Sequence, residues 1–254
     1  MIYGQISNVL GFILLVVLLT ILKLRGVQFS QFIDITSLIV VLGGTLIAGL
    51  FSYKFSTINA LKLHVQEILK KRIDIKTDID DLIGVLRTLQ KGDLLEAEKV
   101  VNNVKSSFLR FGLNLYLDNS SSEELVKLMN WKIKQTEQAG HNLANVLYTM
   151  SNYAPAFGLL GTLMGLIGML SDLGTRDLGL IGTKMALALI TTFYGILFSN
   201  LVFRPVAIKI EQRTLEKVRQ MTILYEGLLL ARRGSSPYMI QEHLKDTISK
   251  VLHE

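Results

Sequence analysis

The chain has 254 residues, of which half are hydrophobic, and its mean hydropathy of +0.40 is typical of a membrane protein with an aqueous portion. It contains no cysteine, which excludes disulfides and thiolate metal sites. Its four histidines lack metal-ligand spacing, and neither a phosphate-binding loop nor a nucleophile elbow is present, so we expect no metal site, no cofactor and no enzymatic activity.

Two apolar runs near the N-terminus predict a first pair of membrane helices. The first is centred on residues 10–22, and we expect a retained helix because no Lys or Arg precedes it and no cleavage site of small residues follows it. The second runs from about Ile33 to Phe51 and contains three glycines, which favour close packing. Asp34 stands at its entrance, where an acidic residue is usually a helix cap or a partner of the helix dipole.

Residues 53–146 differ from the runs before them, because charge rises and the apolar pattern becomes amphipathic. A helix over residues 78–90 should stop at Gly92, and Asp93 should cap the helix that follows. Residues 120–122 should start a further helix that continues into the third membrane span. After residue 205 we expect a long helix, a break at residues 234–236 and a last amphipathic helix that opens on Pro237.

Two longer apolar runs, residues 148–170 and 181–203, organise the rest of the chain. Each has the roughly 20 residues that a helix needs to cross a membrane, and Pro155 and Pro205 lie at their outer turns. The first run repeats glycine along one helical face, where another backbone can approach closely. These glycines are Gly158, Gly161, Gly165 and Gly168.

Hydroxylated side chains accompany the small residues of both runs. Thr162 lies on the stripe beside the glycines. The second run carries small and polar residues on one face and beside it: Ala188, Thr191, Thr192, Gly195, Ser199 and Asn200. Such a helix pair suits either ordinary small-residue packing or a polar path across the membrane.

None of the predicted spans has an Asp, Glu or His in its interior, where proton pumps and carriers usually place one. If ions pass through an assembly that contains this chain, either a partner supplies the titrating carboxylate or hydroxyl and carbonyl oxygens alone coordinate the ion. Threonines and unpaired backbone oxygens around Pro155 suit a hard cation such as sodium.

The placement of basic residues predicts the orientation of the chain. Of the 27 Lys and Arg residues, 23 lie in residues 53–146 and 204–254. By the positive-inside bias these two regions and both termini are cytoplasmic, and two short loops lie outside. The net charge of +6 therefore reflects membrane orientation and not nucleic-acid binding, since no basic stripe with interleaved aromatic residues is present.

Two motifs resemble the third and fourth spans of the MotA/PomA flagellar stator subunits. They are Pro155-Ala-Phe-Gly-Leu-Leu-Gly-Thr-Leu-Met-Gly-Leu and Ala186-Leu-Ala-Leu-Ile-Thr-Thr-Phe-Tyr-Gly-Ile-Leu-Phe-Ser-Asn. The resemblance covers nearly the whole chain and includes Phe32-Ile-Asp-Ile-Thr-Ser, a central loop of about ninety residues and the exit at Pro205. The related TolQ and ExbB proteins typically have three spans, so four predicted spans favour the flagellar branch.

The resemblance implies a subunit of an ion-driven motor in the bacterial inner membrane. Such subunits form a ring, thought to have five copies, around a dimer of a MotB- or PomB-like partner. The partner's single span supplies the ion-binding Asp, and its periplasmic domain grips peptidoglycan. Ion flow rotates the ring, and charged residues of the cytoplasmic loop act on the rotor protein FliG.

Several residues match positions with known roles in the family. Pro155 and Pro205 match the two prolines that couple ion passage to the cytoplasmic domain. Positions that carry hydroxyls in sodium-driven members are matched by Thr162, Thr191 and Thr192. Asp34 matches the periplasmic-loop acid of the sodium type. The resemblance therefore favours sodium over protons as the transported ion and PomA-like members as the nearest branch.

The rotor-contacting charges match only in part. Lys91 and Glu98 match two members of that charge set, but Gln90 stands where the family has Arg, and Lys99 where it has an acid. Arg87 and Glu96 lie on neighbouring turns and are the substitutes that we expect. Each of the charged residues, taken alone, also fits an ordinary solvated helix face.

The sequence thus predicts an all-α integral membrane protein with four transmembrane helices, a helical cytoplasmic domain between spans 2 and 3, and a helical cytoplasmic tail. The predicted parts are residues 1–52, 53–146, 147–206 and 207–254. Two alternatives are a proton-driven ExbB- or TolQ-like energiser of an outer-membrane system and a self-sufficient cation channel.

Overall fold

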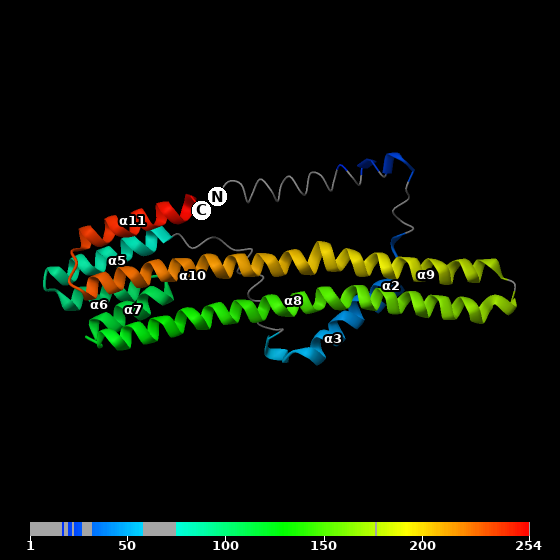
Figure 1. Cartoon of the computed structure of the whole chain (residues 1–254), viewed down its shortest axis with the longest axis horizontal. Coiled ribbons are helices and arrows are strands. Elements are labelled where there is room, and N and C mark those ends of the chain that lie inside the picture. Colours follow the sequence, from blue (N-terminus) through cyan, green and yellow to red (C-terminus); the bar gives the residue numbers. More distant parts are fainter. Residues whose placement is uncertain are drawn as a thin grey trace. The chain divides into compact units, whose positions relative to one another are not determined.

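The structure, a computed structural model, describes residues 32–57, 75–175 and 177–253, together with residues 17, 20, 21 and 23–26. In these ranges all regular secondary structure is helical (Figure 1). The elements are α2 (Ile35–Leu38), the π-helical turn η2 (Ile39–Gly43), α3 (Gly44–Ser52), α5 (Ile75–Gln90), α6 (Leu94–Asn103), α7 (Ser107–Leu117), α8 (Ser122–Asp172), the short η3 (Leu173–Thr175), α9 (Leu178–Leu197), the π-helical turn η4 (Phe198–Phe203), α10 (Arg204–Arg232) and α11 (Pro237–His253).

Local signals in the sequence set several helix ends. Gly92, two residues after α5, has a φ of +82°, which only glycine adopts without strain. The Asp93 side chain accepts a hydrogen bond from the Glu96 backbone N–H at 2.9 Å and so caps α6. Pro237 is the first residue of α11. These three predictions are confirmed. Helix α8 also confirms the prediction of one helix that starts near residues 120–122 and continues into the third predicted span.

Three helical stretches are long and apolar enough to cross a membrane within the described part of the chain: Ile35–Ser52, Ser122–Asp172 and Leu178–Arg232. They contain the second, third and fourth predicted spans. The first predicted span, centred on residues 10–22, lies largely outside the described residues and stays a prediction.

The chain divides into two compact units. Unit 1 comprises Met1–Ile58 and Val146–Val206, and unit 2 comprises Asn59–Asn145 and Ala207–Glu254. Helix α8 contributes residues to both units, as does α10.

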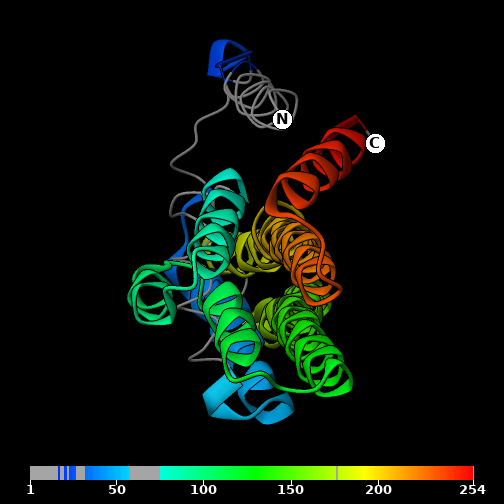
Figure 2. The same cartoon turned by 90° about the vertical axis from the view of Figure 1, so that its left-hand side faces the viewer.

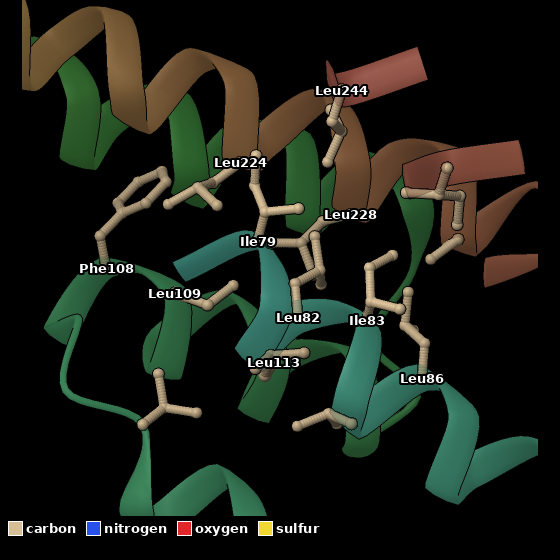
Figure 3. Close-up of a cluster of buried hydrophobic side chains, with 14 of the residues drawn as sticks. Ile79, Leu82, Ile83, Leu86, Phe108, Leu109, Leu113, Leu224, Leu228 and Leu244 are labelled. Carbon is tan, nitrogen blue, oxygen red and sulfur yellow. The ribbon is translucent and has the colours of Figure 1, made fainter. Parts of the chain in front are cut away.

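Unit 2 is built around one hydrophobic core, to which α5, α6, α7, α8, α10 and α11 all contribute (Figures 1 and 2). On α5 the buried apolar residues recur at helical spacing: Ile79, Leu82, Ile83, Val85 and Leu86. They meet Leu224 and Leu228 of α10 and Leu109 and Leu113 of α7 (Figure 3). A Cβ on Gly112 would overlap the side chain of Leu228, so the absence of a side chain there lets α7 approach α10 closely.

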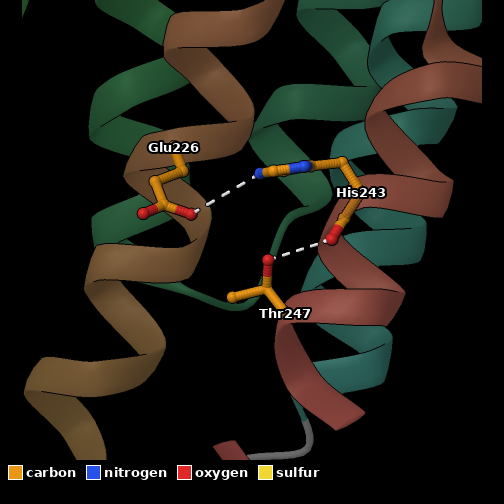
Figure 4. Close-up of polar contacts among 3 residues, drawn as sticks. All are labelled: Glu226, His243 and Thr247. Atoms are coloured by element: carbon orange, nitrogen blue, oxygen red, sulfur yellow. Dashed lines mark hydrogen bonds and ion pairs between the residues drawn. The ribbon is translucent and has the colours of Figure 1, made fainter. Parts of the chain in front are cut away.

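Apolar packing and not charge holds α11 against α10. Glu226 Oε2 and His243 Nε2 lie 3.9 Å apart, and the Thr247 hydroxyl donates to the His243 carbonyl at 3.0 Å (Figure 4). Both side chains are about half exposed, at 44% and 54%, and an exposed pair of this kind contributes only about 0–1 kcal/mol. Ile240 and Leu244, both fully buried in the core, contribute more.

Leu228→Ala should destabilise the protein by about 2–5 kcal/mol, because it leaves a cavity at a fully buried position. Leu215→Ala is the matched control on the same helix: its side chain is 50% exposed, and its loss should cost less than about 1 kcal/mol. Unfolding of the purified full chain, followed by circular dichroism in denaturant, measures both. Equal losses would contradict the assignment of the core.

Candidate functional site

Helices α8 and α9 touch through their backbones in unit 1. A Cβ built on Gly158 would lie 3.0 Å from the Thr191 carbonyl oxygen, and one on Gly165 would lie 2.8 Å from the Lys184 carbonyl oxygen. From the opposite side, a Cβ on Gly195 would lie 2.7 Å from the Ala154 carbonyl oxygen. The glycines named in the sequence therefore face α9, and a side chain at Gly158, Gly165 or Gly195 would collide with the backbone of the other helix.

Thr191 occupies the space that Gly161 leaves open. A Cβ on Gly161 would lie 2.6 Å from the Thr191 side chain, and Thr191 is completely buried. Its hydroxyl donates to the Ala188 carbonyl at 2.9 Å. Thr191 thus lies within the contact between α8 and α9, with its proton engaged and its oxygen lone pairs still available as acceptors.

The other two candidate threonines are half-buried. The Thr162 hydroxyl donates to the Leu159 carbonyl at 2.6 Å, which leaves its lone pairs free. Thr192 Oγ1 is buried and makes no hydrogen bond to any described residue. A buried hydroxyl without a partner is costly, so Thr192 offers an unused polar group at this helix pair.

Pro155 lies inside α8, where it lacks the N–H that would bond to the Ser151 carbonyl four residues earlier. The hydroxyl of Ser199 donates to that carbonyl at 2.6 Å. Both Ser151 and Ser199 are buried. A side chain from η4 therefore replaces the backbone donor that the proline removes.

Pro205 is the second residue of α10, which begins directly after the π-helical turn η4. The backbone N–H of Arg204 donates to the Ser199 carbonyl, which is the five-residue spacing of a π turn. A wider turn is a known way for a helix to continue past a proline, whose ring would otherwise clash with the preceding turn. Both predicted coupling prolines thus lie at irregular points of otherwise continuous helices.

Asp34 is the N-cap of α2, as its position in the sequence predicted. Its carboxylate accepts a hydrogen bond from the Ser37 backbone N–H at 2.6 Å. The Tyr194 hydroxyl of α9 accepts from the Asp34 backbone N–H at 3.3 Å and donates to the Phe32 carbonyl at 2.7 Å. Within the described residues, Asp34 makes no hydrogen bond to the candidate threonines.

The four candidate rotor-contacting residues lie on the turn between α5 and α6 and on the flanking helices, and all are exposed: Arg87, Lys91, Glu96 and Glu98. Arg87 donates to the Gln241 side chain of α11 at 3.2 Å. Gln90 and Lys99, the two departures from the family pattern, are exposed as well. The whole set is therefore available to a partner.

Sequence reasoning missed three features of these sites. Leu94 and Leu95, directly after the Asp93 cap, are 52% and 73% exposed and add an apolar element to the charged hairpin. No local signal indicated this exposure, because adjacent residues of a helix can both be buried in one core, as Leu82 and Ile83 of α5 are. Tyr194 and Ser199 were named as aromatic or small members of a motif, and no local signal indicated their partners.

The chain is similar to known proteins along most of its length. The model of the MotA/TolQ/ExbB proton channel family matches residues 100–223. The chain is 30% identical over 238 residues to the uncharacterised protein YtxD of Bacillus subtilis strain 168, covering 92% of this chain and 87% of the relative. It is 27% identical over 226 residues to the chemotaxis protein PomA of Vibrio alginolyticus, covering 89% and 88% respectively.

A solved structure, that of the flagellar MotAB stator complex from Bacillus subtilis, contains a chain with the same fold. Its TM-score with this chain is 0.80 at 24% identity, and the match covers 95% of this chain and 97% of that one.

Gly195→Ala should destabilise the protein by about 1–3 kcal/mol, because its Cβ meets the backbone of α8, which cannot rotate away as a side chain can. Gly182→Ala is the matched control, since it lies on the same helix and a Cβ there meets nothing within 4 Å. Thermal denaturation in detergent compares the two. A neutral Gly195→Ala would contradict the backbone contact between α8 and α9.

Proposed function

The chain belongs to the MotA/TolQ/ExbB proton channel family, and from this membership we propose that it is the ion-conducting stator subunit of a bacterial flagellar motor. It is a multi-pass membrane protein of a channel family, so the prediction that it is not an enzyme is confirmed. In this role it converts inward cation flow into rotation of a ring of subunits and torque on the rotor.

The observation that carries the proposal is the α8–α9 pair with its small residues and threonines. This pair, Pro155 of α8 and Pro205 of α10 lie inside the region that the family model matches. Relatives named for chemotaxis and for the flagellar stator match this chain along almost its full length, which supports a motor subunit over an ExbB-like energiser.

We propose that a MotB-like partner supplies the ion-binding carboxylate. In the described parts of the three long apolar helices, residues 35–52, 148–170 and 181–203 contain no Asp, Glu or His. These segments hold no carboxylate or imidazole that could bind and release a proton, and a carboxylate from a partner chain would also balance the charge of a bound cation. The proposed assembly is a ring of five copies around a dimer of that partner.

Sodium is the ion that we propose. The hydroxyls of Thr162 and Thr191 donate their protons to backbone carbonyls, which leaves oxygen lone pairs for a hard cation. Thr192 adds a buried hydroxyl with no partner among the described residues. Protons moving along water chains are the competing interpretation.

For the rotor contact we propose the exposed hairpin of α5 and α6 with Arg87, Lys91, Glu96 and Glu98. It would face FliG in the cytoplasm, with both termini on the same side of the membrane, as the distribution of basic residues predicts. Exposed charges of both signs suit repeated, weak electrostatic contacts better than permanent binding.

The experiment that tests this function measures motor speed against external sodium, at fixed pH and membrane potential, in cells whose only stator is this subunit with its cognate partner. Speed that rises and saturates with sodium is expected. Motor speed that does not depend on sodium but falls with a protonophore would support the stator function with protons, not sodium, as the transported ion. A correctly inserted protein that gives no rotation would favour the ExbB-like energiser.

Thr162→Ala should weaken the dependence of speed on sodium, because it removes a half-buried oxygen beside the glycine face of α8. Thr183→Ala is the control: its exposed hydroxyl, near the start of α9, also donates to a backbone carbonyl, that of Gly179, at 2.9 Å. The sodium concentration that gives half-maximal speed should rise in the first variant and stay constant in the second. The same value in both variants would remove Thr162 from the ion path.

A further inference from the structure

Ser199 makes an unusual hydrogen bond for a serine in an apolar helix. Other hydroxyls of these helices, those of Thr162, Ser171 and Thr191, donate to carbonyls three or four residues earlier in their own helix. The Ser199 hydroxyl instead crosses to α8 and donates to the carbonyl of Ser151 at 2.6 Å.

The acceptor of this bond is the one carbonyl of α8 that Pro155 deprives of its α-helical donor. In a helix the N–H of residue 155 would bond to the carbonyl of residue 151, and proline has no N–H. Ser151 is 6% exposed, so water does not readily replace the missing donor. An unpaired carbonyl is costly in hydrocarbon, which makes the Ser199 hydroxyl the group that allows the proline at this position.

Ser199 also takes part in the irregular turn next to Pro205. Its own carbonyl accepts the hydrogen bond from the Arg204 N–H that closes the π turn η4. The side chain of Ser199 therefore bonds at the bend of Pro155, and its backbone bonds at the bend of Pro205. Ser199 is 7% exposed and has little room to adopt another rotamer.

We propose that Ser199 is a positioning residue that links the two prolines mechanically, so that a change of bend at Pro155 is transmitted through the Ser199–Ser151 hydrogen bond to the π turn before Pro205. The inference rests on the proposed stator function and adds a residue to it. The structure shows the link in its bonded state, and breaking this one hydrogen bond would give the second state that a switching element requires.

The Ser199–Ser151 hydrogen bond is strong enough to shift the ratio of two helix conformations and weak enough to break and re-form. A net contribution typical of one hydrogen bond corresponds to about a fivefold change in the ratio of two conformations. Such a ratio biases the bend without locking it. A carbonyl that is alternately bonded and released gives α8 and η4 a common degree of freedom, which ordinary packing of small residues does not provide.

The first test is a double-mutant cycle on the purified full chain. Ser199→Ala should lower the apparent Tm by about 2–4 °C, because it leaves the Ser151 carbonyl unpaired. In a Pro155→Ala background the backbone N–H returns to that carbonyl, so adding Ser199→Ala should lower Tm much less. An equal loss in both backgrounds would overturn the link, because the serine would then act independently of the proline.

The second test measures rotation in cells that depend on this stator, by recording the discrete speed increments as single stator units join a motor. The size of an increment reports torque per unit, and the number of increments reports assembly. Ser199→Ala should reduce the size of the increments. A smaller number of increments of unchanged size would indicate a merely structural role and overturn the proposal.

Ser171→Ala is the matched control for both tests. Ser171 lies on α8, the helix that contains the acceptor Ser151. Its hydroxyl donates at 3.0 Å to the carbonyl of Ile167, which no proline deprives of its backbone donor. It should change neither Tm nor the speed increments. Wild-type cells that fail to rotate would refute the proposed stator function, while the Tm cycle would still decide whether Ser199 and Pro155 are coupled.

Discussion

The contact between the backbones of α8 and α9 is the constraint on which the rest of unit 1 depends. Lipid is as apolar as leucine, so two helices gain little by turning leucines toward each other, and close approach replaces the hydrophobic effect. Glycine at positions 158, 165 and 195 removes the side chains that would keep the helices apart. Large apolar side chains consequently point away from this contact, and Leu163 and Ile167 are 52% and 65% exposed.

This close contact decides how polar groups can be accommodated. Each buried hydroxyl needs a partner within the protein, and a carbonyl of the same helix is the nearest acceptor, as for Thr191. A proline adds the opposite problem, since it leaves an acceptor without a donor. Because α8 and η4 lie so close, one serine can serve the carbonyl freed by Pro155. A carbonyl that has lost its helical donor can thus be satisfied here because small residues bring a second helix within hydrogen-bonding distance.

The sequence predicted what depends on local chemistry. Gly92 and Asp93 set helix ends through backbone strain and capping, both of which involve neighbours in the chain. The cap at Asp34 was predicted for the same reason, but its connection through Tyr194 was not. Nor was the bond from Ser199 to Ser151, because it depends on the register of two helices, and a shift of one residue rotates a side chain by about 100°. The exposure of Leu94 and Leu95 likewise follows only from which face of α6 the core covers.

The two units are stabilised by different physics, and this difference bears on where motion can occur. Unit 2 has a conventional core of interlocking leucines, in which Leu82, Leu109 and Leu228 are fully buried and any rearrangement costs many contacts. Unit 1 relies on a smooth, glycine-lined contact with few interlocking side chains. Helices that meet through such surfaces slide and bend at smaller cost, since no large side chain must leave a pocket. Pro155 and Pro205 both lie in unit 1, where few large side chains oppose bending, and a hydrogen bond such as that of Ser199 can then decide which bend is populated.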